Sequence, residues 1–140
     1  MTVRDQNLST VGFLTATFKI HQTTGTDDLK DIDIGKAVSI VGNNEISFGA
    51  NGAVLLGKLI GLSLTDADNG KRVATVQIGG TCRLPSAATI PVVSNRVVVN
   101  GAGAVKQAPV LAAYDPAGGN VARGTVISVN GSTDVTLMLN

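Results

Sequence analysis

Two runs of alternating apolar and polar residues flank a polar loop in the middle of the chain. In the first run, Ile60, Leu62 and Leu64 recur at every second position. In the second run, Val76 and Ile78 do the same. A period of two places side chains on one face of a β-strand, whereas a helical face repeats every three or four residues. The loop is rich in Asp, Asn and Gly, which favour tight turns, so the pattern predicts a central β-hairpin or paired β-arch.

The same alternation marks the two ends of the chain. Within residues 11–20 the apolar side chains of one face lie at even positions: Leu14, Ala16, Phe18 and Ile20. Phe13 falls on the opposite, polar face, where we expect it to cover a neighbour or an interface. In the last run, Val135, Leu137 and Leu139 share one face and follow a Gly-Ser-Thr turn. This pattern predicts a C-terminal hairpin that ends within one residue of Asn140.

Turn residues divide the remaining chain into short strands. Asn43-Asn44 separates two runs with hairpin spacing, 38–41 and 45–48, and Asn100-Gly101 separates another two. Gly79-Gly80 interrupts the second central strand, which predicts a bulge, a sharp bend or a close approach of backbone. Residues 31–34 alternate Asp with Ile and lead into a turn. Only 8–14 and 108–114 have room for a helical turn.

These elements predict an all-β barrel or sandwich with short hairpins. We expect a single β domain at 13–140 and an extended N-terminal arm at 1–12. The arm is polar, and it is either a frayed terminus or a segment that orders only on a partner. The candidate residues for contact with a partner are Thr2, Val3, Arg4, Asp5, Gln6, Asn7, Leu8 and Phe13.

The amino-acid composition indicates what kind of surface the protein has. Of the 140 residues, 44% are hydrophobic but only 3% are aromatic, so Val, Leu, Ile and Ala must build the core. Charged residues make up 15%, against roughly 25% in an average soluble domain. This shortage predicts that other subunits or another protein cover part of the surface. The alternative is a small neutral protein rich in Thr, Ser and Asn.

Charge and hydropathy argue against two classes of partner. The net charge is +1, and no Lys/Arg cluster is interleaved with aromatics, so we expect no nucleic acid partner. The first ten residues lack the apolar core of a signal peptide. No apolar run approaches the roughly 20 residues that span a membrane, so we expect no membrane partner.

Candidate chemistry is sparse. His21 and Cys82 are the only imidazole and the only thiol, and they lie far apart in the sequence, so they offer no catalytic dyad. A solvated His and a small buried Cys are the expected roles. The single Cys also excludes an intrachain disulfide and permits assembly in a reducing cytosol. We therefore predict no enzymatic activity and no catalytic residues.

Two short motifs imitate ligand sites. Residues 52–58, G-A-V-L-L-G-K, match part of a phosphate-binding loop, but Leu59 follows where Ser or Thr would contact Mg²⁺. The loop at Asp66 and Asp68 suggests Ca²⁺, but the twelfth position of an EF-hand loop would be Gln77 instead of Glu. We predict no cofactor and no metal.

The order of these pieces resembles that of one known family. The segment G-K-L-I-G-L-S-L-T-D-A-D-N-G-K-R-V-A-T-V-Q-I-G-G-T-C-R-L-P, residues 57–85, resembles tailed-phage capsid decoration (head-cement) proteins. The later segments R-V-V-V-N-G-A-G-A-V and G-T-V-I-S-V-N-G-S-T-D-V-T-L-M-L are also similar to that family, so the resemblance covers about 30–140. The motifs that carry the resemblance are structural.

The resemblance implies a small β-barrel or β-tulip-like domain on the outer surface of an icosahedral capsid. Its implied partners are the major capsid protein and further copies of itself, commonly as homotrimers at local threefold positions. It implies that the protein is made in the host cytoplasm, joins the virion and ties neighbouring capsid subunits together. Such a cement acts through many weak contacts at repeated sites.

Two other functions stay open. A different structural virion component, such as a tail-tube or head-fibre module, would share this β-rich composition, although many short strands disfavour a continuous tube. A small-ligand or carbohydrate-binding β-sandwich typically uses exposed aromatics. The chain has few aromatic candidates for that role: Phe13, Phe18, Phe48 and Tyr114.

Overall fold

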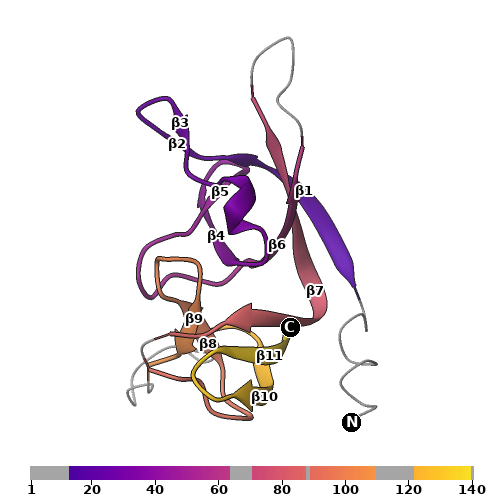
Figure 1. Cartoon of the computed structure of the whole chain (residues 1–140), viewed down its shortest axis with the longest axis vertical. Helices are drawn as coiled ribbons and strands as arrows, with labels where there is room; N and C mark the ends of the chain where they lie inside the picture. The colour runs from indigo at the N-terminus through magenta and orange to yellow at the C-terminus, as the bar shows by residue number, and fades with distance from the viewer. Residues whose placement is uncertain (1–12, 64–70, 88, 110–121, 140) are drawn as a thin grey trace.

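The structure is a computed structural model that describes residues 13–63, 71–87, 89–109 and 122–139. In these residues it contains eleven β-strands and one turn of 3-10 helix (Figure 1). The elements are β1 Leu14–Ile20, β2 Gln22–Thr23, β3 Thr26–Asp27, η1 Asp31–Asp33, β4 Ala37–Gly42, β5 Glu45–Ser47, β6 Gly57–Leu62, β7 Val73–Pro85, β8 Val97–Val99, β9 Val105–Gln107, β10 Thr125–Asn130 and β11 Asp134–Leu139. The predicted all-β fold class is confirmed.

Strands β1, β5, β4, β6 and β7 close into a small barrel. Each pairs with the next in that order, and β7 returns to β1. The pairs are antiparallel except β1–β5, which is parallel with Lys19 beside Glu45. Inward-facing apolar side chains fill the barrel: Ile20, Leu29, Val38, Ile46, Leu59, Ala74 and Val76. Closure pairs most strand edges internally, which a flat sheet of this size cannot do.

Strand β7 connects the barrel to the rest of the molecule by bending in its middle. Its first half pairs with β1 and β6, and its second half pairs with β11 from Gly80 to Pro85. Gly80 has φ +83°, a backbone conformation that side chains with a Cβ seldom adopt. Figure 1 shows β7 turning at this point. The bend predicted from Gly79-Gly80 is confirmed.

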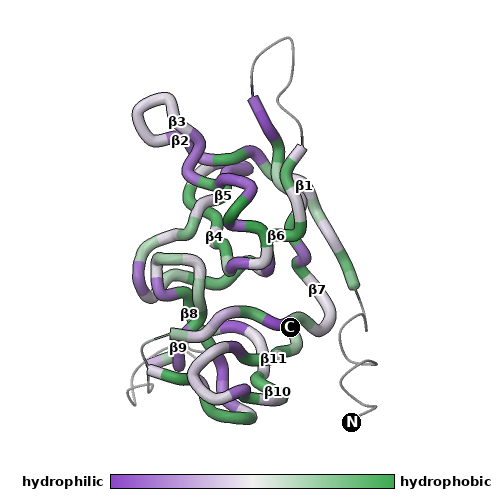
Figure 2. Tube along the Cα trace, in the orientation of Figure 1, coloured by the Kyte–Doolittle hydropathy of each residue, from purple (hydrophilic) through white to green (hydrophobic). Residues whose placement is uncertain are grey.

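A second core lies beyond the bend. It is enclosed by the second half of β7, the β10–β11 hairpin and the β8–β9 hairpin, and its buried members include Leu84, Val97, Val105, Val135 and Leu137. Figure 2 shows apolar residues on the strands that enclose this core, and all three valines of β8 are buried. Val135, Leu137 and Leu139 are all buried, so the predicted face of the C-terminal hairpin is confirmed.

Two further predicted hairpins are present. β4 and β5 pair antiparallel around Asn43-Asn44, and Asn44 has φ +59°. β8 and β9 pair antiparallel around the Asn100-Gly101 turn. There the Asn100 side-chain oxygen accepts bonds from the backbone N–H groups of Ala102 and Ala104, at 2.8 and 3.1 Å. An Asn side chain that satisfies loop donors in this way holds a turn without further packing.

The central hairpin, β6–β7, forms as predicted but with a shifted phase. Leu59 is fully buried, while Ile60 and Leu62 are half-buried. A register shift between Leu59 and Gly61 accounts for this, because an extra residue in one strand changes which side chains face the core. Leu64 and the polar loop with Asp66 lie outside the described residues.

In the segment before β4, an apolar side chain is exposed and an acidic side chain is buried. Ile32 is 80% exposed, whereas Asp33 is buried in the 3-10 turn η1. The Asp33 carboxylate accepts bonds from the Lys30 backbone N–H at 2.8 Å and the Lys36 ammonium at 3.0 Å. The expectation that helical turns occur only at 8–14 or 108–114 is therefore wrong. Residues 8–12 and 110–114 lie outside the described part.

Candidate interaction surface

Seven of the eight predicted contact residues, Thr2 to Leu8, lie outside the described residues. The eighth, Phe13, precedes β1 and its side chain is 48% exposed. Leu14, the first residue of β1, is 58% exposed and lies opposite Gly79 at the bend of β7. Figure 2 shows the apolar start of β1 projecting from the barrel. This end of β1 therefore presents two large apolar side chains to solvent.

A second exposed apolar group lies in the connector between β7 and β8. Ile90, Val92 and Val93 are each at least 40% exposed. The connector is held at both sides, because the Val92 N–H donates to the Gln107 side-chain oxygen at 3.0 Å and the Ser94 N–H donates to the Val126 carbonyl at 2.8 Å. These bonds keep the apolar side chains in contact with solvent instead of letting them fold inward.

Further exposed apolar residues follow from strand alternation. Met138 is 44% exposed because its neighbours Leu137 and Leu139 take the buried face of β11. Ile40 and Val41 are exposed near the end of β4, where the register shifts. Single exposed apolar residues are ordinary, but clusters of them in a charge-poor chain are typical of surfaces that contact another protein.

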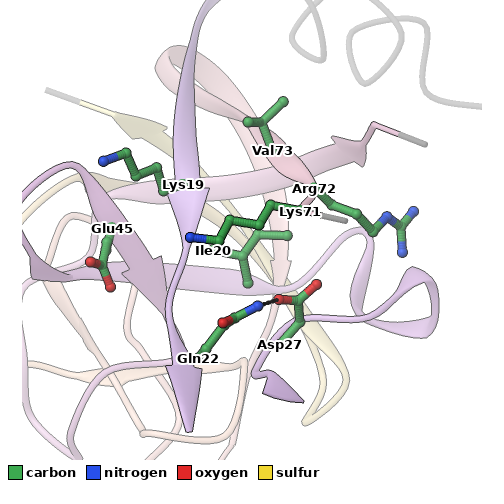
Figure 3. A pocket seen from close by; sticks show the side chains of 8 residues that line it. All are labelled: Lys19, Ile20, Gln22, Asp27, Glu45, Lys71, Arg72 and Val73. Carbon is green, nitrogen blue, oxygen red and sulfur yellow. Dashed lines mark hydrogen bonds between the residues drawn. The ribbon is translucent and has the colours of Figure 1, made fainter. Parts of the chain in front are cut away.

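A shallow pocket of about 530 Å³ opens at one end of the barrel (Figure 3). Its floor includes a hydrogen bond from the Gln22 amide to the Asp27 carboxylate at 2.8 Å. Side chains of both charges line it, and Arg72 already binds Asp31 at 2.6 Å. The lining residues are Lys19, Ile20, Gln22, Asp27, Glu45, Lys71, Arg72 and Val73. None is aromatic, so the pocket offers no surface on which a sugar ring could stack.

His21 has a carboxylate partner that the sequence did not indicate. Its Nδ1 lies 2.9 Å from Asp28, and Asp28 also accepts bonds from the hydroxyls of Thr23 and Ser47, at 2.7 and 2.9 Å. Partial burial acts to raise the pKa of the Asp28 carboxyl, but the bonds from Thr23, His21 and Ser47 outweigh burial and hold that pKa below its usual value.

This cluster is not arranged for nucleophilic catalysis. In a catalytic triad the imidazole lies between the hydroxyl and the carboxylate, so that it can take the hydroxyl proton. Here Asp28 lies between His21 and Ser47, and the Ser47 hydroxyl donates to the carboxylate. The arrangement fixes the β2–β3 turn to the barrel.

Cys82 and the glycine-rich motif have structural roles. Cys82 is 3% exposed, and burial raises the pKa of its thiol to about 11 against the opposing effects of Lys58 and Arg123. Gly57, within the motif that imitates a phosphate loop, begins β6. A Cβ built on it would lie 1.9 Å from the Gln77 carbonyl oxygen. The glycine therefore allows two strands to approach closely.

Arg123 is a further polar feature that the sequence pattern gave no reason to single out. Its guanidinium is half-buried and donates to the carbonyls of Leu55 at 3.2 Å, Leu56, and Ile78 at 2.5 Å. Its own backbone pairs with Val97. Burial lowers the pKa of this guanidinium. The Arg123 side chain thus connects the segment before β6 to the middle of β7, and its backbone connects both to β8.

Within the part of the chain that the structure describes, no group of three or more His, Cys, Asp or Glu side chains could hold a metal ion. The same residues contain no helix of sufficient length and apolarity to cross a membrane. Comparisons with protein families, curated proteins and solved structures find no match to this chain.

Proposed function

We propose that the protein is a structural component of a virus particle that binds the outer surface of an icosahedral capsid and cements neighbouring major capsid subunits. The observation that carries the proposal is the set of large apolar side chains held in solvent on a rigid β framework. Phe13 and Leu14 form one group, and Ile90, Val92 and Val93 form another. A framework with fixed apolar contacts binds with little loss of conformational entropy.

The low charge of the chain supports the same proposal. Protein interfaces are depleted in charged residues at their centre, and each partner of a standard interface covers roughly 800 Å². A chain with 15% charged residues can give up that much surface without burying many ions. On a capsid, each contact is weak, and the sum over repeated sites provides the stabilisation.

The proposal extends to the number of copies and the place of assembly. Copies cluster as homotrimers at threefold positions of the shell, after synthesis in the host cytoplasm. The reduced, buried Cys82 is compatible with that compartment. The protein acts by surface complementarity and not by catalysis, which is consistent with the Asp28-centred arrangement of His21 and Ser47.

Binding to capsids tests the proposal. Purified protein is mixed with capsids that lack it, and the bound fraction is measured by co-sedimentation at increasing concentration. We expect saturation at a fixed ratio to the major capsid protein. Phe13→Asp, Val93→Asp and Met138→Asp each place a charge in one exposed apolar group. At least one of them should weaken binding by about tenfold or more, because a desolvated charge costs more than about 1.4 kcal/mol.

Ser128→Asp is the matched control, since Ser128 is an exposed polar residue of β10. It should bind as the wild type does, and circular dichroism should show that all variants fold. Failure of the wild-type protein to bind, or binding that none of the three apolar variants weakens, would refute the proposal.

A further inference from the structure

Strand β1 has one edge that is only partly covered. The edge that faces β7, its inner edge, pairs with β7 from Leu14 to Lys19. Its outer edge pairs with β5 only at Lys19 and Ile20, which lie beside Glu45 and Ile46. Upstream of Lys19, no described residue pairs with the outer edge. Among the described residues, the outer edge from Leu14 to Phe18 therefore has no strand beside it (Figure 1).

The hydrogen bonds of β1 show which backbone groups point outward. The Lys19 N–H donates to the Asn44 carbonyl at 2.8 Å and the His21 N–H donates to the Ile46 carbonyl at 2.9 Å, both on the outer side. Alternate residues of a strand direct their N–H and C=O groups to the same edge. Thr15 and Thr17 therefore point their backbone groups outward, and both residues are exposed.

From Leu14 to Phe18 this edge lacks two of the usual protections against pairing, a charged residue and a proline, although its register with β7 shifts between Leu14 and Thr15. Exposed edges are normally blocked by Lys, Pro, a bulge or a covering loop. The segment Leu14–Phe18 reads L-T-A-T-F and contains no charge and no proline. By contrast, the free side of β10 is covered at Val126, which exchanges backbone hydrogen bonds with Ser94 and Asn95.

We propose that two copies of the chain join by antiparallel pairing of their β1 edges about a twofold axis at Ala16. In this register Thr15 of each copy lies opposite Thr17 of the other, and both exchange N–H···O=C bonds. Leu14 lies opposite Phe18 of the second copy. Apolar side chains thus meet apolar ones on one face, and threonines meet threonines on the other.

The register follows from the available backbone groups. A twofold axis at Thr17 would pair Thr15 with Lys19 of the second copy, but the Lys19 N–H is already bonded to Asn44. An axis at Thr15 would pair Thr17 with Phe13, outside the strand. Only the axis at Ala16 uses both outward-facing threonines of both copies and leaves the β1–β5 pairing intact.

This contact is a property of the chain alone and is independent of capsid binding. On a capsid it would connect copies that belong to neighbouring threefold clusters. The pairing can be tested with purified protein, so its failure and the failure of capsid binding are separate results.

Disulfide trapping is the sharpest test. Residues opposite each other at a non-hydrogen-bonded position of an antiparallel pair have Cα atoms about 4.5 Å apart, which a disulfide can bridge. In a Cys82→Ala background, Ala16→Cys should form a covalent dimer under mild oxidation. Thr17→Cys is the matched control. Two Thr17 residues lie diagonally in this register, about 8–9 Å apart, beyond the reach of a disulfide.

We expect Ala16→Cys to dimerise at least tenfold faster than Thr17→Cys. Equal rates, or an Ala16→Cys protein that stays monomeric, would overturn the proposal. A second measurement avoids new cysteines. In sedimentation at the highest soluble concentration, wild type and Thr17→Val should form dimers, whereas Thr17→Pro, which lacks the outward N–H, should be monomeric. A monomeric wild type, or a folded Thr17→Pro that dimerises normally, would also overturn it.

Discussion

Arg123 is expected to contribute more to stability than any other charged side chain described. Substitution by Ala removes its bonds to the carbonyls of Leu55, Leu56 and Ile78, which lie 45 to 68 residues away in the sequence. Hydrogen bonds to charged groups contribute about 1.5–3 kcal/mol each. Because the side chain is half-buried and water can replace part of each bond, we take about 1 kcal/mol per bond. Arg123→Ala should therefore lower the free energy of unfolding by about 3 kcal/mol.

Thermal and urea denaturation measure this loss. For a chain of this length, 1 kcal/mol shifts Tm by about 4 °C, so the expected decrease is about 12 °C. Arg123→Lys keeps the charge but loses the planar fork, and it should recover less than half of the difference. Arg83→Ala is the control, since Arg83 is 61% exposed and 3.6 Å from Asp134. Exposed ion pairs contribute at most about 1 kcal/mol.

The reasoning would be refuted if Arg123→Ala were no less stable than Arg83→Ala. It would also be refuted if Arg123→Lys matched the wild type, because the geometry of the guanidinium would then be irrelevant. Either result would mean that packing alone holds the barrel to the second core.

Three further substitutions or conditions test other parts of the structure. Gly57→Ala should lower the free energy of unfolding, measured by urea denaturation, by at least about 3 kcal/mol, because the added Cβ would meet the Gln77 backbone. Gly61→Ala is the control and should be tolerated, because no atom lies within 4 Å of a Cβ at that position. Because the pKa of Asp28 is lowered from 3.8, the ionised carboxylate should stabilise the fold fully above about pH 4, and this stabilisation should be lost as the pH falls further. Asp28→Asn should make the free energy of unfolding less dependent on pH in this range. The Cys82 thiol should resist alkylation in the native protein at pH 8 but react once unfolded. Because its pKa is raised from 9.0 to about 11, stability should decline as pH rises through that interval, and Cys82→Ala should remove the decline.

Elements set by local alternation could be predicted from the sequence. The face of β11 was read correctly because Val135, Leu137 and Leu139 are apolar and their neighbours are polar or exposed. Gly79-Gly80 predicts a bulge, a bend or a close approach, and the bend is present because Gly80 adopts a backbone conformation that most residues avoid. In both cases the information lies within a few adjacent residues.

Features set by contacts between distant segments could not be predicted. The parallel pairing of Lys19 with Glu45 closes the barrel, but nothing in either strand specifies the partner. The three acceptors of Arg123 are backbone carbonyls, which every residue has, so no side-chain pattern marks them. Asp33 is buried because the Lys30 N–H and Lys36 satisfy its carboxylate, and such bonds outweigh the hydrophobicity of Ile32.

The candidate surface was predicted only in part. Phe13, predicted on the polar face beside β1, is 48% exposed. Val92 and Val93 were not singled out, because an apolar pair beside Pro91 is compatible with burial as well as with exposure. Their exposure depends on the bonds that Gln107 and Val126 make to the connector.

The most direct test of the proposed capsid function is the number of copies in purified virus particles, measured by quantitative mass spectrometry against the major capsid protein. We predict a ratio near one, or a simple fraction set by the threefold positions of the lattice. A handful of copies would instead indicate a tail or fibre component. Complete absence from the particles would contradict the proposed function.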